Sequence, residues 1–219
     1  MPLRNIILLA PSGLVLFAKD SDAAGRASRA FQRRGADAAS SRSRPLLRKR
    51  YVALASKKVK QRGKVVGDLK KSRRGAWKLT RTLEDPSRTL YWSAGALPAK
   101  EEPAPGEQTR PASRLVVLEP QTGRTHQLRC VMRSLGAPII GDALYSGDAA
   151  DRCYLHAASL ELDAAELGLA GPGEGVDGVF SVRCPPATGE LWAPAEARVV
   201  HDGAEFEQLW DAAVRDGLL

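Results

Sequence analysis

The stretch Thr122-Gly-Arg-Thr-His-Gln-Leu-Arg129 is short, polar and rich in hydrogen-bond donors. It follows an apolar run at residues 115–118, whose branched side chains predict a β-strand, and it precedes residues 130–135, which we expect to form a helix. Gly123 allows a tight turn where the strand ends. Strand-to-helix junctions with such donors often hold phosphates or catalytic carboxylates. For the octet alone, the alternative interpretation is a solvated polar turn.

Four further motifs surround this octet. Ser12-Gly-Leu-Val-Leu-Phe-Ala-Lys19 and Lys49-Arg-Tyr-Val-Ala-Leu54 precede it, and Gly136-Ala-Pro-Ile-Ile-Gly-Asp-Ala-Leu-Tyr145 and Arg152-Cys-Tyr-Leu-His-Ala157 follow it. In series they resemble the RluA-type family of pseudouridine synthases, over roughly residues 5–200. The resemblance implies an α+β fold, with a mixed, mostly antiparallel central sheet, flanking helices and an RNA cleft. It also implies isomerisation of uridine to pseudouridine without a metal or other cofactor.

The segment before Gly13 departs from the family pattern: Asn5, Ile6 and Ile7 stand for His, Arg and Leu, and Pro11 stands for Thr. The family reads H-R-L-D-x-x-T-S-G at this point, and counting back from Gly13 places Leu8 where the aspartate belongs. The resemblance makes that aspartate the catalytic group, and a leucine side chain can act neither as nucleophile nor as general base. Asp20 and Asp22 lie past the expected strand and are poor substitutes.

The resemblance assigns catalytic roles to two residues that are present. Tyr51 matches the tyrosine that stacks on the target base, and Arg129 matches the arginine that pairs with the catalytic aspartate. With Leu8 in place of that aspartate, we expect Arg129 to lack its family partner. Because a buried, unpaired guanidinium is costly, three outcomes stay open: Arg129 contacts RNA phosphate, its pocket opens to water, or another acid serves it.

A very basic segment, residues 57–81, has Trp77 embedded in it and contains three of the predicted RNA contacts. Aromatic side chains among cations suit stacking on bases beside phosphate contacts; the alternative for Trp77 is packing at a strand edge. Arg124 and Thr125 are candidates for phosphate contacts or for bracing the turn. The complete predicted RNA-binding set is Lys49, Arg50, Arg73, Arg74, Trp77, Arg124 and Thr125.

Four other polar residues in the motifs are expected to be structural. We interpret His126 and His156 as hydrogen-bonding histidines rather than acids or bases. Asp142 and Tyr145 are expected to shape their loop rather than to do chemistry.

The charge of the chain is distributed unevenly. Residues 1–85 carry a formal charge of +16 and residues 86–219 carry −8, which together give the net +8. This asymmetry favours a polyanionic partner for the first part, and the alternative is a solvated basic loop. The predicted partner is RNA, and ribosomal RNA is the first candidate. Ribosomal proteins or assembly factors are further expected partners, and no membrane contact is expected.

The composition predicts one domain and an intracellular setting. Three cysteines without metal-ligand spacing favour a reducing compartment, and no apolar run approaches the length of a membrane span. An organellar ribosome, such as a mitochondrial one, is one expected location, and the cytoplasm is the other. We expect a domain at residues 1–200 that lacks the family's N-terminal part, with a basic insertion at 36–49, an exposed loop at 98–111 and a C-terminal helix at 201–219.

Hydrophobic patterns and turn formers predict the remaining elements. We expect strands at residues 14–18, 49–54, 64–66, 114–118, 159–162 and 179–183, and a helix at 22–34 that begins after a cap at Asp20 or Ser21 and closes at Gly35.

Three functions are compatible with these observations. The first is a catalytically inactive pseudouridine-synthase-like protein that binds RNA, on or within a ribosome or assembly particle. The second is an active synthase acting on ribosomal or transfer RNA. The third is a protein-binding scaffold that does not touch RNA. The first is favoured because Leu8 removes the inherited chemistry while the basic surface remains.

Overall fold

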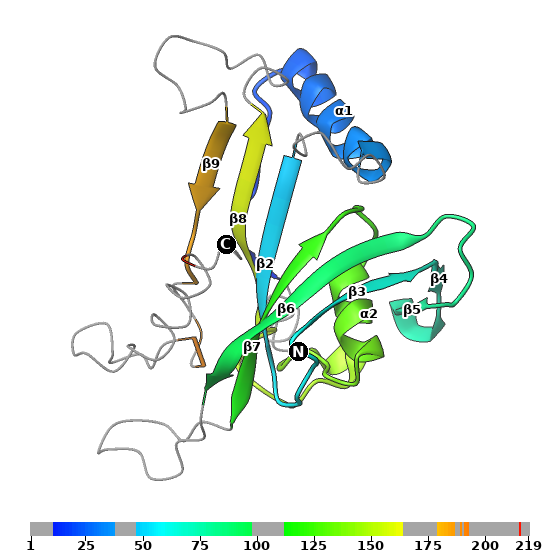
Figure 1. Cartoon of the computed structure of the whole chain (residues 1–219), viewed down its shortest axis with the longest axis vertical. Coiled ribbons are helices and arrows are strands. Elements are labelled where there is room, and N and C mark those ends of the chain that lie inside the picture. Colours follow the sequence, from blue (N-terminus) through cyan, green and yellow to red (C-terminus); the bar gives the residue numbers. More distant parts are fainter. Residues whose placement is uncertain are drawn as a thin grey trace, which may run out of the picture.

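A mixed sheet dominates the computed structural model, which describes residues 11–37, 47–97, 112–163, 179–186, 189, 191–192 and 215. Seven strands form this sheet, in the order β1-β8-β2-β7-β6-β3 with β9 paired to β8 (Figure 1). Within the described residues β1 and β8 run parallel, whereas the other neighbours are antiparallel. The fold is therefore α+β with a mostly antiparallel sheet, which confirms the prediction.

The strands of the main sheet are β1 (Ser12–Gly13), β2 (Leu47–Ala55), β3 (Arg62–Gly67), β6 (Ser87–Leu97), β7 (Ser113–Pro120), β8 (Leu155–Asp163) and β9 (Val179–Arg183). A separate two-stranded sheet consists of β4 (Leu69–Lys71) and β5 (Trp77–Leu79), with the 3-10 helix η2 (Arg73–Gly75) between them. The helices are α1 (Ser21–Asp37), α2 (Gln127–Ser134) and the 3-10 helix η3 (Ala143–Tyr145).

The core is built on β2, β7 and β8. Val52, Leu54, Val116 and Leu118 are fully buried, and neighbouring positions of β2 and β7 are buried as well. Strands covered on both faces are apolar at consecutive positions rather than at alternate ones. This explains why the run before the octet is continuously hydrophobic, and why its end point is held firmly in the centre of the sheet.

The two faces of β2 carry different residues, because side chains alternate along a strand. Tyr51 lies opposite Leu118, and Leu118 lies opposite Tyr91 of β6, so these side chains share a face with Thr89. Helix α2 covers this face, since its Gln127 donates a hydrogen bond to Thr89. Lys49 and Tyr51 therefore point to the α2 side of the sheet.

The opposite face of β2 carries a buried charge cluster. Arg50 is 6% exposed and donates from Nε to Glu119 Oε2 of β7 at 3.2 Å. Its Nη1 lies 3.7 Å from Glu161 of β8, and Arg48 approaches the same two carboxylates at 3.5 Å. These charges are compensated across three adjacent strands. Arg50 was predicted to contact RNA, but its guanidinium is buried and paired with glutamates of the protein itself.

The strand predictions agree with the structure in most of the sheet, but one predicted strand does not form and three strands were missed. β9 has the expected bounds, and β2, β3, β7 and β8 extend the expected runs by a few residues. Residues 14–18 do not form the predicted strand: β1 ends at Gly13, and Val15 and Phe17 are 70% and 85% exposed. A run of apolar residues indicates a strand only when a neighbouring strand or a core receives it, and here pairing to β8 ends at residue 13. Three strands, β4, β5 and β6, were not anticipated.

The helices begin and end differently from the prediction. Asp20 caps α1, since its Oδ1 accepts the Ala23 N–H at 2.7 Å. The helix passes through Gly35 and ends at Asp37, so the expected stop at Gly35 is wrong. Helix α2 begins at Gln127, three residues earlier than expected.

Several predicted segments lie outside the described residues. These are Leu8, the loop at 98–111, residues 38–46 of the expected basic insertion, and the C-terminal helix apart from Arg215, which is helical. The flanks of the insertion are ordered differently from the expectation, because residues 36–37 belong to α1 and 47–49 to β2. Among the helices that the structure describes, none combines the length and apolar character that crossing a membrane requires.

Removing Glu119 should destabilise the fold. In Glu119→Ala, the Arg50 guanidinium stays buried and keeps only its longer contact to Glu161, so we expect the free energy of unfolding to fall by about 3 kcal/mol. Urea denaturation followed by circular dichroism measures this change. Asp22→Ala, which removes the exposed Arg26–Asp22 pair of α1, is the control and should have little effect. Equal losses in the two variants would contradict the assignment.

Candidate functional site

Hydrogen bonds tie the octet at residues 122–129 to β6. The Thr122 hydroxyl accepts the Arg88 N–H at 3.0 Å and donates to Gln127 Oε1 at 2.8 Å. Gln127 is 4% exposed, and its Nε2 donates to the Arg88 carbonyl and to Thr89 Oγ1, both at 2.9 Å. The turn between β7 and α2 is therefore braced by its own polar side chains. These two residues are structural, not available to a ligand.

Arg129 forms a two-pronged ion pair with Asp142. Its Nε and Nη2 donate to the two carboxylate oxygens at 2.8 and 2.6 Å. The Asp142 side chain is fully buried and that of Arg129 is 11% exposed. Burial works to lower the pKa of Arg129, but the hydrogen bonds and charge of Asp142 raise it above its ordinary value. Of the three outcomes left open for Arg129, the structure shows the third, in which another acid, Asp142, pairs with it.

The loop before η3 places Asp142 beneath Arg129. Ile140 joins β2 and β8 by donating to the Leu54 carbonyl and accepting from Tyr154 N–H, each at 2.9 Å. Gly141 has φ +78° and packs so closely on the Arg152 carbonyl that a Cβ would lie 1.6 Å from its oxygen. Only glycine fits there. Asp142 was expected to shape the loop, whereas its side chain is the counter-ion of the site.

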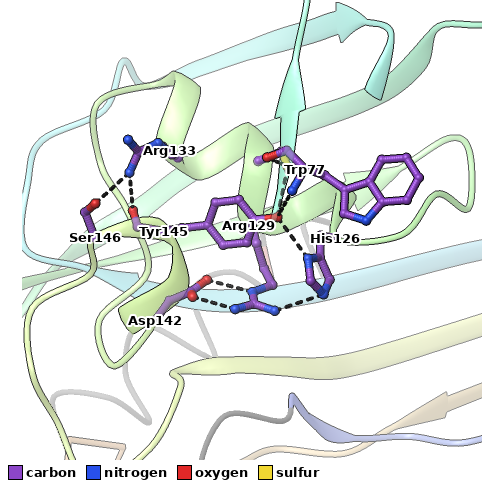
Figure 2. A network of polar contacts seen from close by, with 8 residues as sticks. Trp77, His126, Arg129, Arg133, Asp142, Tyr145 and Ser146 are labelled. Carbon is purple, nitrogen blue, oxygen red and sulfur yellow. Dashed lines mark hydrogen bonds and ion pairs between the residues drawn. The ribbon is translucent and has the colours of Figure 1, made fainter. Parts of the chain in front are cut away.

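The network continues from Arg129 through His126 to Tyr145 (Figure 2). Arg129 Nη1 lies 3.2 Å from His126 Nε2, and His126 Nδ1 lies 2.9 Å from the Tyr145 hydroxyl. Because a guanidinium only donates, Nε2 must accept and Nδ1 must carry the proton that it donates to Tyr145. Burial, with the nearby charge of Arg129, lowers the pKa of His126, so the imidazole is neutral.

Tyr145 is a buried junction in this network. It is 2% exposed, and burial raises its pKa to about 12, so its hydroxyl keeps its proton. Arg129 lies over its ring with Cζ 4.8 Å from the ring centroid, and Arg133 Nη1 donates to its backbone carbonyl at 2.9 Å. The hydroxyl also accepts the backbone N–H of Trp77 at 2.9 Å. A residue expected only to shape a loop therefore joins α2, η3 and β5.

The segment from Leu69 to Leu79, which we call the basic hairpin, carries Arg73, Arg74 and Trp77. Lys70, Lys71, Arg73, Arg74 and Lys78 of this hairpin are all exposed. The Trp77 indole is half-buried, with Lys71 Nζ 6.0 Å from its ring centroid. Figure 2 shows the indole extending away from Tyr145 while its backbone turns toward that residue. The structure thus brings three predicted RNA-binding residues together and joins them to Arg129.

The other predicted residues are distributed around this site. Thr125 is exposed, and Arg124 is exposed with its guanidinium bonded to Asp85. Lys49 and Tyr51 are half-buried on the α2 face of β2. Arg50 lies on the opposite face, as described above. Cys130 and Asp142 were missed as parts of the site. The partners of Cys130 lie on β5 and η3, and Asp142 pairs with Arg129 from thirteen residues further along the chain, so the octet itself gave no signal for either.

His156 is structural, as expected from the sequence. Its Nδ1 lies 2.8 Å from the Ser12 hydroxyl and its Nε2 lies 2.8 Å from the Cys184 carbonyl. A carbonyl only accepts, so Nε2 carries the proton and Nδ1 accepts from Ser12. Burial lowers the pKa of His156. The ring fastens β1 to the end of β9. In the part of the chain that the structure covers, no three His, Cys, Asp or Glu side chains gather as metal ligands.

Comparison with known proteins decides the family. The model described as RNA pseudouridylate synthase matches residues 10–134, which run from before β1 to the end of α2. The chain belongs to this family and is of the RluA type. An uncharacterized RNA pseudouridine synthase of Haemophilus influenzae is 37% identical over 184 residues, which cover 83% of this chain and 66% of that protein.

Two further matches of this RluA-type chain are shorter or more distant. The dual-specificity RNA pseudouridine synthase RluA of Vibrio parahaemolyticus is 42% identical over 82 residues, 37% of this chain and 28% of that one. The solved structure of human RNA pseudouridylate synthase domain containing 1 has a TM-score of 0.50 at 23% identity, covering 77% of this chain and 62% of the other. That likeness concerns the fold. The chain spans about two thirds or less of each of these proteins.

Asp142→Asn should destabilise this RluA-type domain strongly. The substitution leaves the Arg129 guanidinium buried without its counter-ion, and we expect the free energy of unfolding to fall by about 3–5 kcal/mol. Chemical denaturation measures the loss. Asp148→Asn, which changes an exposed carboxylate on the same loop, is the matched control. A loss below about 1 kcal/mol for Asp142→Asn would contradict a tightly coupled pair.

The two structural histidines should make stability depend on pH. Both pKa values lie below the ordinary 6.5 in the folded state, so the unfolded chain binds protons first as the pH falls. Their contribution is therefore fully present above pH 6.5 and is lost progressively below it. NMR titration of the imidazole Hε1 resonances measures both values, and thermal unfolding between pH 7.5 and 5 measures the stability. A pKa above 6.5 for either ring would contradict the neutral assignment.

Proposed function

We propose that this chain is an RNA-binding member of the RluA-type family that does not isomerise uridine. The main observation behind the proposal is that Arg129 already forms an ion pair with Asp142. Both oxygens of Asp142 are used by Arg129, and His126 accepts a third guanidinium hydrogen bond. Asp142 thus balances the charge of Arg129 without a carboxylate at position 8, where the sequence has leucine.

Asp142 does not replace the missing catalytic aspartate. Its residue surface is fully buried, and both carboxylate oxygens face the guanidinium. A nucleophile or general base must reach the atom it attacks. Asp142 is therefore a structural counter-ion, and Leu8 leaves the reaction without its acid or base.

The surface that supports RNA binding is basic and exposed. From Lys57 to Arg81 the chain has a single acidic residue, Asp68, and this residue is buried. The segment's cations are all exposed: Lys57, Lys58, Lys60, Arg62, Lys64, Lys70, Lys71, Arg73, Arg74, Lys78 and Arg81. Phosphate attraction by such a field is strong and independent of sequence. Trp77 adds a ring for stacking on an unpaired base.

The second candidate function is an active synthase. The family, and the presence of Tyr51 and Arg129 at the matching positions, favour it. The two candidates share the RNA partner and differ in the chemistry at position 8. We propose structured ribosomal RNA, free or in a ribosomal particle, as the first RNA to test, in either an organellar or a cytoplasmic setting.

Tritium release separates the two candidates. Isomerisation frees the hydrogen at uridine C5, so we expect no release above background from ribosomal RNA labelled at that position. The same RNA should bind with a steep salt dependence, and the double variant Arg73→Gln/Arg74→Gln should reduce the log–log salt slope by about 1 for each lost phosphate contact. An active RluA-type enzyme is the positive control. Release by the native chain would overturn the inactive assignment, and absence of RNA binding would overturn the proposal as a whole.

A further inference from the structure

The basic hairpin is not part of the main sheet. Its strands β4 and β5 pair only with each other among the described residues, from Leu69 opposite Leu79 to Lys71 opposite Trp77. Asp68 closes its base: the carboxylate accepts the Glu84 and Asp85 N–H groups at 3.1 and 3.0 Å. These bonds join the hairpin to the next stretch of chain.

A second set of hydrogen bonds, at the outer edge of β5, joins the hairpin to α2 and η3. Ser72 N–H donates to the Ala76 carbonyl at 2.8 Å, and antiparallel pairs alternate between bonded and non-bonded, so the neighbouring pair Lys71–Trp77 is non-bonded. The N–H and C=O of Trp77 therefore point outward. Tyr145 accepts this N–H at 2.9 Å, and the Cys130 thiol donates to this carbonyl at 3.3 Å.

The side chains of Tyr145 and Cys130 thus bond to the β5 backbone at this edge, where a third strand would otherwise pair. Burial raises the pKa of Cys130, so its sulfur keeps the proton that it donates. The Tyr145 hydroxyl lies 3.5 Å from the same sulfur. It accepts hydrogen bonds from His126 Nδ1 and from the Trp77 N–H. The contacts form one path, from Asp142 through Arg129, His126 and Tyr145 to the Trp77 backbone.

We infer that Tyr145 is a positioning residue, whose hydroxyl holds the basic hairpin at a fixed place relative to Arg129. It touches no RNA itself, because it is 2% exposed. Its effect on RNA rests on the proposed function: a hairpin already held in place presents Arg73, Arg74 and Trp77 without an ordering cost at binding. The placement of the hairpin is a property of the free protein and can be measured without RNA.

Tyr145→Phe removes this hydroxyl and keeps the ring beneath Arg129. Losing one hydrogen bond should speed amide exchange at Trp77 about fivefold to tenfold, with β2 amides unchanged. Affinity for a fluorescein-labelled, uridine-rich RNA stem-loop should fall several-fold. Tyr91→Phe deletes a hydroxyl from another buried tyrosine, on β6, and is the matched control without effect at Trp77. Cys130→Ala removes the thiol contacts to the Trp77 carbonyl and the Tyr145 hydroxyl but keeps the Tyr145–Trp77 hydrogen bond, so it should give a smaller change in the same place.

Hydrogen exchange and RNA affinity test different parts of the inference. Unchanged exchange at Trp77, or an equal acceleration in β2 and the hairpin, would overturn the positioning role. If the native chain does not bind the stem-loop, the proposed function fails while hydrogen exchange still decides this inference. If exchange at Trp77 rises and RNA affinity does not change, Tyr145 fixes the hairpin without serving RNA, and the role assigned to it in binding is overturned.

Discussion

The buried pair of Arg129 and Asp142 sets the geometry of the whole site. A guanidinium that is 11% exposed is tolerated only with its charge compensated and its donors bonded. Three donors are used, two on Asp142 and one on His126. This requirement fixes the loop at residues 139–145 against β2 and β8. It also selects the tautomer of His126, which then orients the Tyr145 hydroxyl. The side chains of Asp142, Arg129, His126 and Tyr145 thereby connect α2 to the outer edge of β5, in a separate hairpin.

The sheet separates two kinds of positive charge. Arg48 and Arg50 point away from α2 and are compensated by glutamates on the neighbouring strands; Arg50 is buried and Arg48 is half-buried. The cations of the basic hairpin are exposed and have no acidic neighbours within the hairpin sequence. Only the second kind contributes a field that a polyanion can reach. Alternation along β2 accounts for why adjacent residues in Lys49-Arg50-Tyr51 serve different surfaces.

Local patterns were sufficient for much of the fold and for little of the site. Residues 179–183 alternate and form β9 as predicted, and the apolar run before the octet forms β7. Residues 14–18 have an equally apolar pattern, yet pairing to β8 stops at Gly13, a fact about neighbours that the segment itself does not contain. β6 was missed although it spans eleven residues, because its mixed sequence acquires a strand's environment only between β3 and β7. Likewise, the partner of Arg129 lies thirteen residues away, and sequence spacing did not distinguish Asp142 from the other acids that follow.

The octet has a structural role that does not depend on the reaction. Within the octet, Thr122 and Gln127 bond to β6, while His126 and Arg129 are held in an internal network. Of the octet, Gly123, Arg124 and Thr125 are exposed. Most of the octet thus specifies how α2 attaches to the sheet, and none of these contacts needs a carboxylate at position 8. The side chains that hold the fold and the group that would do the chemistry lie in different segments. Family membership follows from the fold, whereas activity depends on the group at position 8.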